Sequence, residues 1–358
     1  NMAPRAWMKI GFAHQQAGNT DKAIEAYKQI VQEFPASEER TAAMDALKSL
    51  YIQGGKPDEY AKLLKDTNMG GAEENTLDST YYATAEAQYA TGNWTKAKSL
   101  LAAYFAKYPN GVFAGKAHYY KAESHYQLKE NKEALAEYEQ VLSAPWSNFS
   151  ENSARRAASI AYDLGDMEAA RKYYTELRNI AMTEDNLLTA YNGLMLVSNK
   201  QEESATATAY ADTLLAITTV DKNVKENALL IKANARLTAG NNSEALTTFK
   251  QLETAGIAAI AAEARYNIAY IYYLQDSLKE AETAAGNTIQ LSAGNEYWVV
   301  KSYILLADIL TKQKDYFNAK ATLQSVIKNS KVPELKTQAS KKLDEVKQLE
   351  NKKTKLSE

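Results

Sequence analysis

Residues 7–35 carry the pattern that decides the fold, and they read WMKIGFAHQQAGNTDKAIEAYKQIVQEFP. Apolar and small residues recur at i, i+3, i+4 and i+7 on either side of the Gly18-Asn19 turn, as in two amphipathic helices. A glycine suits the end of the first helix, and an asparagine suits the N-cap of the second. The stretch therefore predicts two helices joined by a short turn.

The same pattern returns along the whole chain. A marker residue stands five positions after each turn, and successive markers are 35 to 40 residues apart. The markers are Ala23, Tyr60, Ala97, Ala134, Ala170, Ala205, Ala245, Ala281 and Ala319. Twelve residues before them stand Gly11, Lys48, Ala85, Ala122, Ala158, Gly193, Ala233, Ala269 and Ala307. Small residues allow paired helices to approach closely, so nine helix pairs are predicted.

The first repeat resembles the tetratricopeptide repeat family position by position. The matching residues are Trp7, Ile10, Gly11, His14, Gly18, Ala23, Tyr27, Ile30 and Pro35. The resemblance implies an all-α fold, namely a right-handed α-α superhelix (solenoid) of about nine helix pairs plus a C-terminal capping helix. It also implies a non-catalytic scaffold that binds a partner protein or peptide along the concave face.

Departures from the repeat predict how the solenoid is divided. We expect repeats one and two at 1–66, repeats three to nine at 67–332, and a capping helix with a tail at 333–358. The polar, glycine-containing stretch 66–75 predicts a kink at 66–78, and the spacing of 40 after Ala205 predicts a longer connection at 218–227. No polar cap precedes Pro4, so we expect either further repeats before residue 1 or self-association through this end.

Composition excludes several classes of function. The 358 residues hold 42 Lys+Arg, 44 Asp+Glu and no cysteine, which rules out disulfides, thiol catalysis and Cys-ligated zinc. With a net charge of −2, no nucleic-acid binding is expected. The longest uncharged run, between Asn186 and Lys200, is shorter than the roughly 20 residues of a membrane-spanning helix, so no membrane insertion of this chain is expected.

Motifs for catalysis are missing as well. Ser325 and Lys328 have the Ser-x-x-Lys spacing of a serine acylase but lack its companion motifs. We therefore expect no enzyme activity, no catalytic residues, no metal and no cofactor. The alternative is an enzyme or small-molecule binder whose chemistry lies outside this chain or in a pocket near His118 and His125.

Tyrosines provide the candidate binding residues. Of the 35 aromatic residues 24 are tyrosine, and several recur at i, i+4 and i+7 on first helices. Tyrosine combines a large apolar ring with a hydroxyl at low entropic cost, which suits peptide recognition. In the family these positions line the concave face, which nominates Tyr82, Glu86, Tyr89, Tyr119, Glu123, Tyr126, Tyr162, Tyr266, Tyr270 and Tyr273. The alternative is that several of these rings pack between adjacent repeats.

The resemblance also bears on the compartment. Segments 80–86 and 117–123 are similar to the Tyr-rich repeats of bacterial envelope proteins, including the tol-pal-associated and outer-membrane-assembly families and large Bacteroidetes repeat proteins. We therefore expect a periplasmic or outer-membrane-associated protein, with the cytoplasm as the alternative. Met8 and Phe12 occupy the slots where chaperone-binding members of the family carry Lys and Asn, which disfavours an Hsp70 or Hsp90 co-chaperone.

Overall fold

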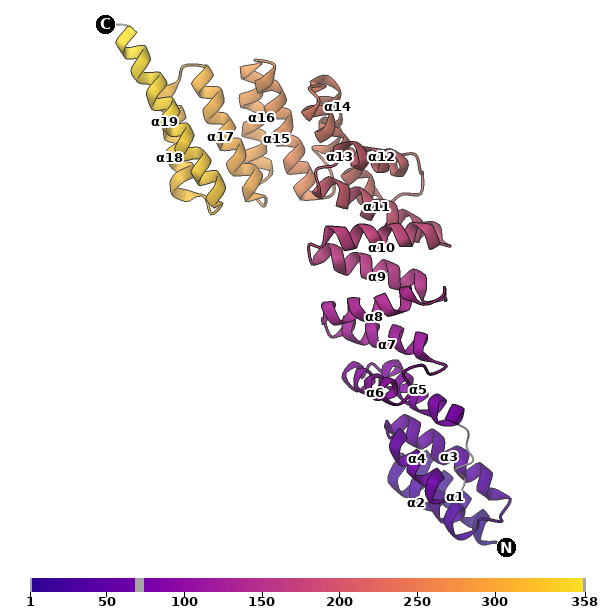
Figure 1. The fold of residues 1–358 in the computed structure, drawn as a ribbon. Coiled ribbons are helices and arrows are strands. Elements are labelled where there is room, and N and C mark those ends of the chain that lie inside the picture. The colour runs from indigo at the N-terminus through magenta and orange to yellow at the C-terminus, as the bar shows by residue number, and fades with distance from the viewer. Residues whose placement is uncertain (1, 68–73, 357–358) are drawn as a thin grey trace. The chain divides into compact units, whose positions relative to one another are not determined.

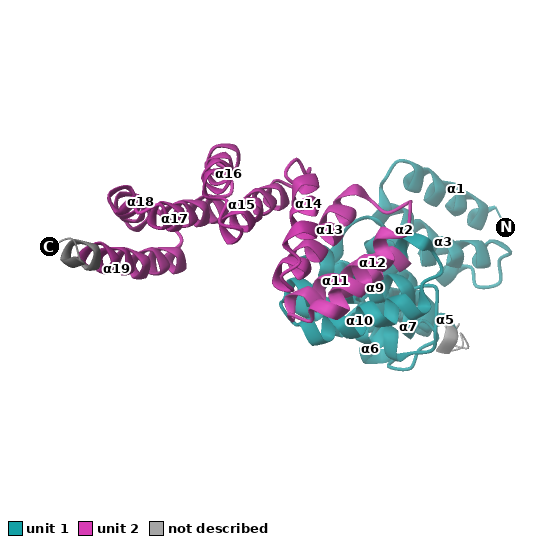
Figure 2. Ribbon diagram, turned by 90° about the horizontal axis from the view of Figure 1, so that it is seen from above, with its two compact units in different colours: residues 1–186 teal, residues 187–358 magenta. Residues whose placement is uncertain are grey.

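The structure is a computed structural model that describes residues 2–67 and 74–356. All regular secondary structure in these ranges is helical. The chain divides into two compact units, unit 1 at Asn1–Asn186 and unit 2 at Leu187–Glu358 (Figure 2). The predicted all-α class is confirmed. The predicted division at 66 and 332 is untested and stays a prediction.

Successive helices form the pairs that the sequence predicts (Figure 1). The first five pairs, which lie in unit 1, are α1 (Ala3–Gln16) with α2 (Thr20–Glu33), α3 (Glu39–Gly54) with α4 (Pro57–Asp66), α5 (Glu74–Ala90) with α6 (Trp94–Lys107), α7 (Ala114–Gln127) with α8 (Asn131–Ser143), and α9 (Ser150–Asp163) with α10 (Met167–Ile180). The others are α11 (Glu184–Lys200) with α12 (Ser204–Leu215), α13 (Lys222–Thr238) with α14 (Asn242–Leu252), α15 (Ala258–Leu274) with α16 (Leu278–Leu291), and α17 (Glu296–Lys312) with α18 (Tyr316–Asn329). The C-terminal helix is α19 (Pro333–Leu356).

Packing within each unit follows the chain. The two helices of a pair contact each other in eight pairs, for example α1 with α2 and α15 with α16. First helices of neighbouring repeats also contact each other, as α5 does α7 in unit 1 and α15 does α17 in unit 2. In unit 2 the first helices α13, α15 and α17 and the C-terminal helix α19 contact one another in sequence and form one continuous face, which we call the first-helix face.

Every helix pair in the described ranges turns through one residue with a positive φ. Five of these residues are glycines, for example Gly165 with φ 80°. The other four are Lys129, Glu202, Asp276 and Lys314, with φ between 60° and 67°. A left-handed residue after a helix lets its end close with backbone hydrogen bonds, and glycine takes this conformation without strain. The turn conformation is thus kept even where glycine is absent.

The turn of repeat six corrects the sequence register. Its left-handed residue is Glu202, so the buried residue five positions later is Ala207, whereas the predicted marker Ala205 is exposed. The residue seven positions before the turn is Met195, which is fully buried and replaces the predicted Gly193. Met195 is large, so a search for small residues selects Gly193 and Ala205 in place of Met195 and Ala207. The apparent spacing of 40 disappears with the new register.

A carboxylate near the start of a first helix often ties down the loop that precedes the next first helix. Asp78 accepts a hydrogen bond from the Val112 backbone at 2.9 Å. Glu226 accepts one from the Gly256 backbone at 2.9 Å. These bonds link consecutive repeats and lower the pKa of Glu226 below its usual range, because backbone N–H groups favour the charged carboxylate. They hold the loops in place across the repeat boundary.

The C-terminal helix has the predicted capping role. Leu335, Ala339, Leu343 and Val346 of α19 are buried against α17 and α18. The predicted longer connection at 218–227 is wrong, because α12 and α13 are joined by residues 216–221 and α13 already begins at Lys222. The predicted kink falls mainly on residues 68–73, which lie outside the described residues.

Candidate partner-binding face

The predicted tyrosines of unit 1 all lie on first helices, where Tyr82 is part of the core and the other four are half-buried. Tyr82 on α5 is 3% exposed and stacks on Phe113 with ring centroids 4.7 Å apart. Its hydroxyl donates to Glu86 at 2.9 Å. Tyr119 on α7 is half-buried against Phe149, with centroids 4.6 Å apart. For Tyr82, the alternative that the rings pack between repeats describes the structure better than a contact role does.

Glu123 also faces inward. Its buried carboxylate accepts a hydrogen bond from Tyr138 and lies 3.6 Å from the guanidinium of Arg156 on α9. Arg156 in turn covers the ring of Tyr126 at 4.4 Å and donates to its hydroxyl at 3.1 Å. These contacts tie Glu123, Tyr138, Arg156 and Tyr126 into one cluster, although the buried Nε of Arg156 has no hydrogen-bond partner among the described residues. Tyr89 and Tyr162 are half-buried beside it, and burial raises the pKa of Tyr89 to about 12.

The first-helix face of unit 2 is hollowed into a pocket of about 480 Å³. Such a volume falls in the range of ligand-binding clefts. All three tyrosines predicted for this unit line it, and each comes from α15. The lining residues are Leu237, Tyr266, Asn267, Tyr270, Tyr273, Lys301, Ile304, Leu305, Asp308, Gln338 and Lys342. The pocket is therefore built by α13, α15, α17 and the capping helix α19.

Lys301 is the distinctive group of this pocket. Its ammonium lies 4.9 Å from the ring centroids of both Tyr266 and Trp298, and 5.5 Å from that of Tyr297. Burial lowers the pKa of Lys301, and the nearby charge of Glu263 opposes this shift. The Glu263 carboxylate is engaged by a different group, Asn234, at 2.8 Å. Within the described part of the chain, no ion pair compensates this half-buried cation.

The other charged groups of the pocket are paired. Lys342 on α19 contacts both carboxylate oxygens of Asp308 at 2.7 Å. Burial raises the pKa of Asp308, although this lysine pulls it in the opposite direction. Tyr266 is buried and stacks on Tyr270 with centroids 6.2 Å apart. Lys301, with its ring cage, is thus the group best placed to attract an anion on a partner.

Sequence reasoning found the three tyrosines of this pocket and missed Lys301. Their role as contacts is untested and stays a prediction, and only Tyr270 and Tyr273 are half-exposed enough to serve it directly. The signal for Lys301 was present in the stretch Tyr297-Trp298-Val299-Val300-Lys301, where two aromatic residues precede a lysine at i−4 and i−3. On a helix these three side chains share one face.

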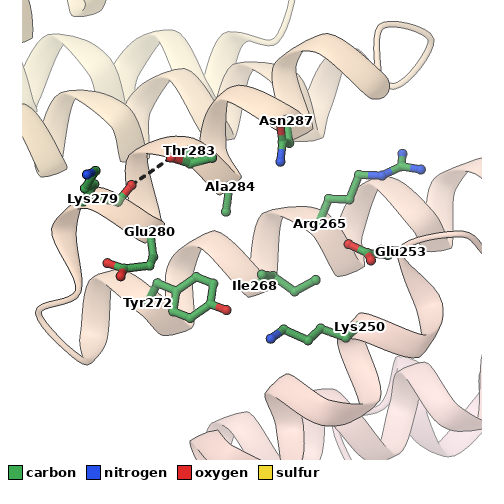
Figure 3. Close-up of a pocket in the computed structure, with 10 residues that line it drawn as sticks. All are labelled: Lys250, Glu253, Arg265, Ile268, Tyr272, Lys279, Glu280, Thr283, Ala284 and Asn287. Carbon is green, nitrogen blue, oxygen red and sulfur yellow. Dashed lines mark hydrogen bonds between the residues drawn. The ribbon is translucent and has the colours of Figure 1, made fainter.

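A second pocket of about 460 Å³ opens on the other side of α15, among α14, α15 and α16 (Figure 3). Ile268, Ala284 and Tyr272 form its apolar wall, and charged residues of both signs surround it. Arg265 at one end is held by the carbonyl of Leu291 at 3.3 Å. Because the charges alternate in sign, this pocket favours no particular ligand charge.

The alternative site near the histidines is occupied by internal bonds. His118 and Glu137 are 2.7 Å apart, and the ring of His118 lies 4.2 Å from that of Phe105. His125 is buried and bonds Glu130 at 2.6 Å. Across the described ranges, no three His, Cys, Asp or Glu residues are grouped so that they could hold a metal ion. No described helix combines the length and the apolarity that crossing a membrane requires.

Comparison with solved structures places the fold. The C-terminal part of a tetratricopeptide repeat protein from Cytophaga hutchinsonii is 14% identical with a TM-score of 0.50, over 71% of this chain and 98% of that one. Yeast Tom70 is 11% identical with a TM-score of 0.40, over 98% and 90%. The Cut9–Hcn1 hetero-tetramer of APC/C is 14% identical with a TM-score of 0.40, and the match spans 52% of that chain, about half its length. No curated protein matches the chain.

Two sequence profiles of the tetratricopeptide repeat match the chain. One covers residues 5–37 and 301–330, and the other covers residues 82–149 and 232–296. Together these stretches make up more than half of the 358 residues and fall in both units. Repeats of this kind support protein–protein interaction scaffolds. The chain belongs to the tetratricopeptide repeat family.

Proposed function

We propose that the first-helix face of unit 2 binds a partner polypeptide and that the partner brings an acidic side chain to Lys301. The observation that carries the proposal is the half-buried ammonium among three aromatic rings, without an ion pair in the described residues. A cation that is partly removed from water gains more from a partner carboxylate than an exposed lysine does. Tyr270 and Tyr273 supply apolar contact area beside it.

Binding at this face is tested by photo-crosslinking in the cell. A photoreactive amino acid replaces Tyr270, and in a matched control it replaces Tyr272, which lies two residues away and lines the other pocket. We expect one discrete crosslinked partner from position 270, and its identification by mass spectrometry. Equal crosslinking from both positions would contradict binding at the first-helix face.

The role of Lys301 is tested in the same crosslinking strain. Lys301→Met keeps the aliphatic stem and removes the charge, so the crosslink from position 270 should weaken about tenfold if the partner offers a carboxylate. Lys279→Met, on the rim of the other pocket, is the control and should leave the crosslink unchanged. A crosslink that survives Lys301→Met would leave the face as a binding site and remove the acidic partner.

We further propose that this scaffold acts in a bacterial cell-envelope assembly. The support is the similarity of the Tyr-rich stretches 80–86 and 117–123 to repeats of envelope proteins. Fractionation of the native cell into periplasm, membranes and cytoplasm, followed by immunoblotting, tests the location. Recovery of the protein with the cytoplasmic enzymes would refute the envelope role without affecting the binding face.

Non-catalytic action and self-association complete the proposal. The alternative of an enzymatic site near His118 and His125 has no support in the geometry, because Glu137 and Glu130 already bond these two side chains. Self-association through α1 has one supporting observation, because Ile10 and Phe12 are 41% and 58% exposed. Light scattering over a range of protein concentrations tests it, and the variant Phe12→Ser should lower any concentration-dependent mass.

A further inference from the structure

Three successive connections between repeats in unit 1 share an unusual composition. They are residues 108–113 (YPNGVF), 144–149 (APWSNF) and 181–183 (AMT), and none contains a charged residue. We call them together the loop edge. Each exposes one large apolar side chain: Val112 is 78% exposed, Trp146 56% and Met182 74%. Single exposed apolar residues are ordinary, whereas one per repeat in three consecutive repeats forms a row.

The topology places the three side chains at one edge of unit 1. Each connection joins the second helix of a repeat to the first helix of the next, so all three lie at the same end of the antiparallel pairs (Figure 1). Packed helices stand 8–10 Å apart, and the row from Val112 to Met182 therefore extends over about 20 Å or more. The turns at the opposite end, 128–130 and 164–166, contain Lys129, Glu130 and Asp166. These two turns carry charge, whereas the three connections of the loop edge do not, although the exposed Glu184 and Asp185 directly follow the third connection.

Hydrogen bonds fix the backbone of these loops while their side chains stay in solvent. The Val112 backbone donates to Asp78 at 2.9 Å, and the Met182 backbone donates to Glu151 at 2.8 Å. Beside Trp146, the Ser147 backbone donates to Ser150 at 2.9 Å. A flexible loop could turn its apolar residue toward the protein. In these loops the backbone hydrogen bonds fix the conformation in which the side chain is exposed. The exposure is thus built into the fold.

We propose that the loop edge rests on the headgroup region of an uncharged, zwitterionic lipid surface. The three exposed side chains come from three separate loops. A lipid surface can adapt its shape to such separate side chains, whereas a rigid groove on another protein cannot. Tryptophan at the centre of the row is the residue that favours the membrane–water interface most. Because the loops lack Lys and Arg, attraction to anionic lipids plays no part.

Such contact differs from membrane insertion of a helix, which the sequence excludes. Three side chains bury little area compared with an amphipathic helix, so the association is weak and reversible and adds to binding by other partners. The inference concerns a different unit and a different surface from the proposed Lys301 site. Either can fail without the other.

Co-flotation with phosphatidylcholine vesicles tests the proposal with the full chain. The wild type should float with the vesicles, equally at low and high salt, and the triple variant V112S/W146S/M182S should lose about fivefold or more of the bound fraction. A matched triple variant, L164S/L291S/F317S, removes exposed apolar side chains elsewhere and should float like the wild type. Circular dichroism of each variant checks that the helices remain.

Fluorescence supplies a second readout. The emission of Trp146 should shift to shorter wavelength on the vesicles and be quenched by brominated phosphatidylcholine, and Trp146→Phe should abolish both effects. The proposal is overturned if the wild type does not float, if the two triple variants float equally, or if only vesicles with anionic lipid bind. Concentration-dependent dimerisation lost in V112S/W146S/M182S, without flotation, would assign the row to a protein interface instead.

Discussion

Replacing Gly165 by alanine should destabilise the protein by about 0.5–1 kcal/mol. Gly165 has φ 80°, and a non-glycine residue in the left-handed region costs about 1–2 kcal/mol. The reduced entropy of the unfolded chain returns about 0.4–1 kcal/mol of this. Nothing lies within 4 Å of an added Cβ at Gly165, so no clash contributes. The whole effect therefore comes from the backbone conformation.

The reverse substitution should have the opposite sign. Lys129 occupies the equivalent turn of the preceding repeat with φ 63°, so Lys129→Gly should raise stability by about 0.5–1 kcal/mol. Gly286 is a control for the chemical change itself, since it lies inside α16 with an open Cβ position, and Gly286→Ala should stabilise by about 1 kcal/mol. The same Gly→Ala change thus destabilises at the turn and stabilises in the helix.

Urea denaturation followed by far-UV circular dichroism measures all three variants against the wild type. The order of midpoints should be Gly286→Ala and Lys129→Gly above the wild type, and Gly165→Ala below it. Repeat arrays can unfold in steps, so the midpoint of the first transition is the quantity to compare. A lower midpoint for Lys129→Gly, or a raised one for Gly165→Ala, would refute the role assigned to the left-handed turn residues.

Three further changes test the repeat packing. Glu226→Gln should destabilise the protein at pH 7 by about 2 kcal/mol and should match the wild type in acid. The reason is that a carboxylate with a lowered pKa stabilises the fold above its unfolded pKa near 4.3 and loses this contribution as the pH falls. Urea midpoints measured at several pH values check this. Gly11→Ala should cost about 1–3 kcal/mol, since the added Cβ would lie 2.5 Å from the ring of Tyr27; an unchanged thermal midpoint would show that the ring can move away. Leu323→Ala removes a fully buried side chain under α19 and should cost about 2–4 kcal/mol, with the loss of protection from hydrogen exchange centred on α18 and α19.

The repeat architecture could be predicted from the sequence because close packing constrains it at short range. Marker residues such as Ala23 and Ala134 are fully buried in the structure, as their small size predicts. The one error of register arose in repeat six, where Met195 holds the position that a small residue holds in most other repeats. Its turn residue Glu202 is tolerated with a positive φ because strain of about 1–2 kcal/mol at one turn is small compared with the packing of two helices. A search based on burial periodicity alone would have found Ala207.

The environment of each candidate binding residue was less predictable, because identical spacing produces different surroundings. Tyr82, Tyr119 and Tyr266 stand at comparable positions on first helices, yet Tyr82 stacks on Phe113 and Tyr266 borders the cage of Lys301. What separates them is the residue brought over from the next repeat, which lies 30 to 35 positions along the chain, namely Phe113, Phe149 and Lys301. A repeat sequence therefore reveals its scaffold through what the repeats share. The binding site that we propose depends instead on what one repeat has alone among the described residues, namely Lys301 within 5.5 Å of two tyrosine rings and a tryptophan ring.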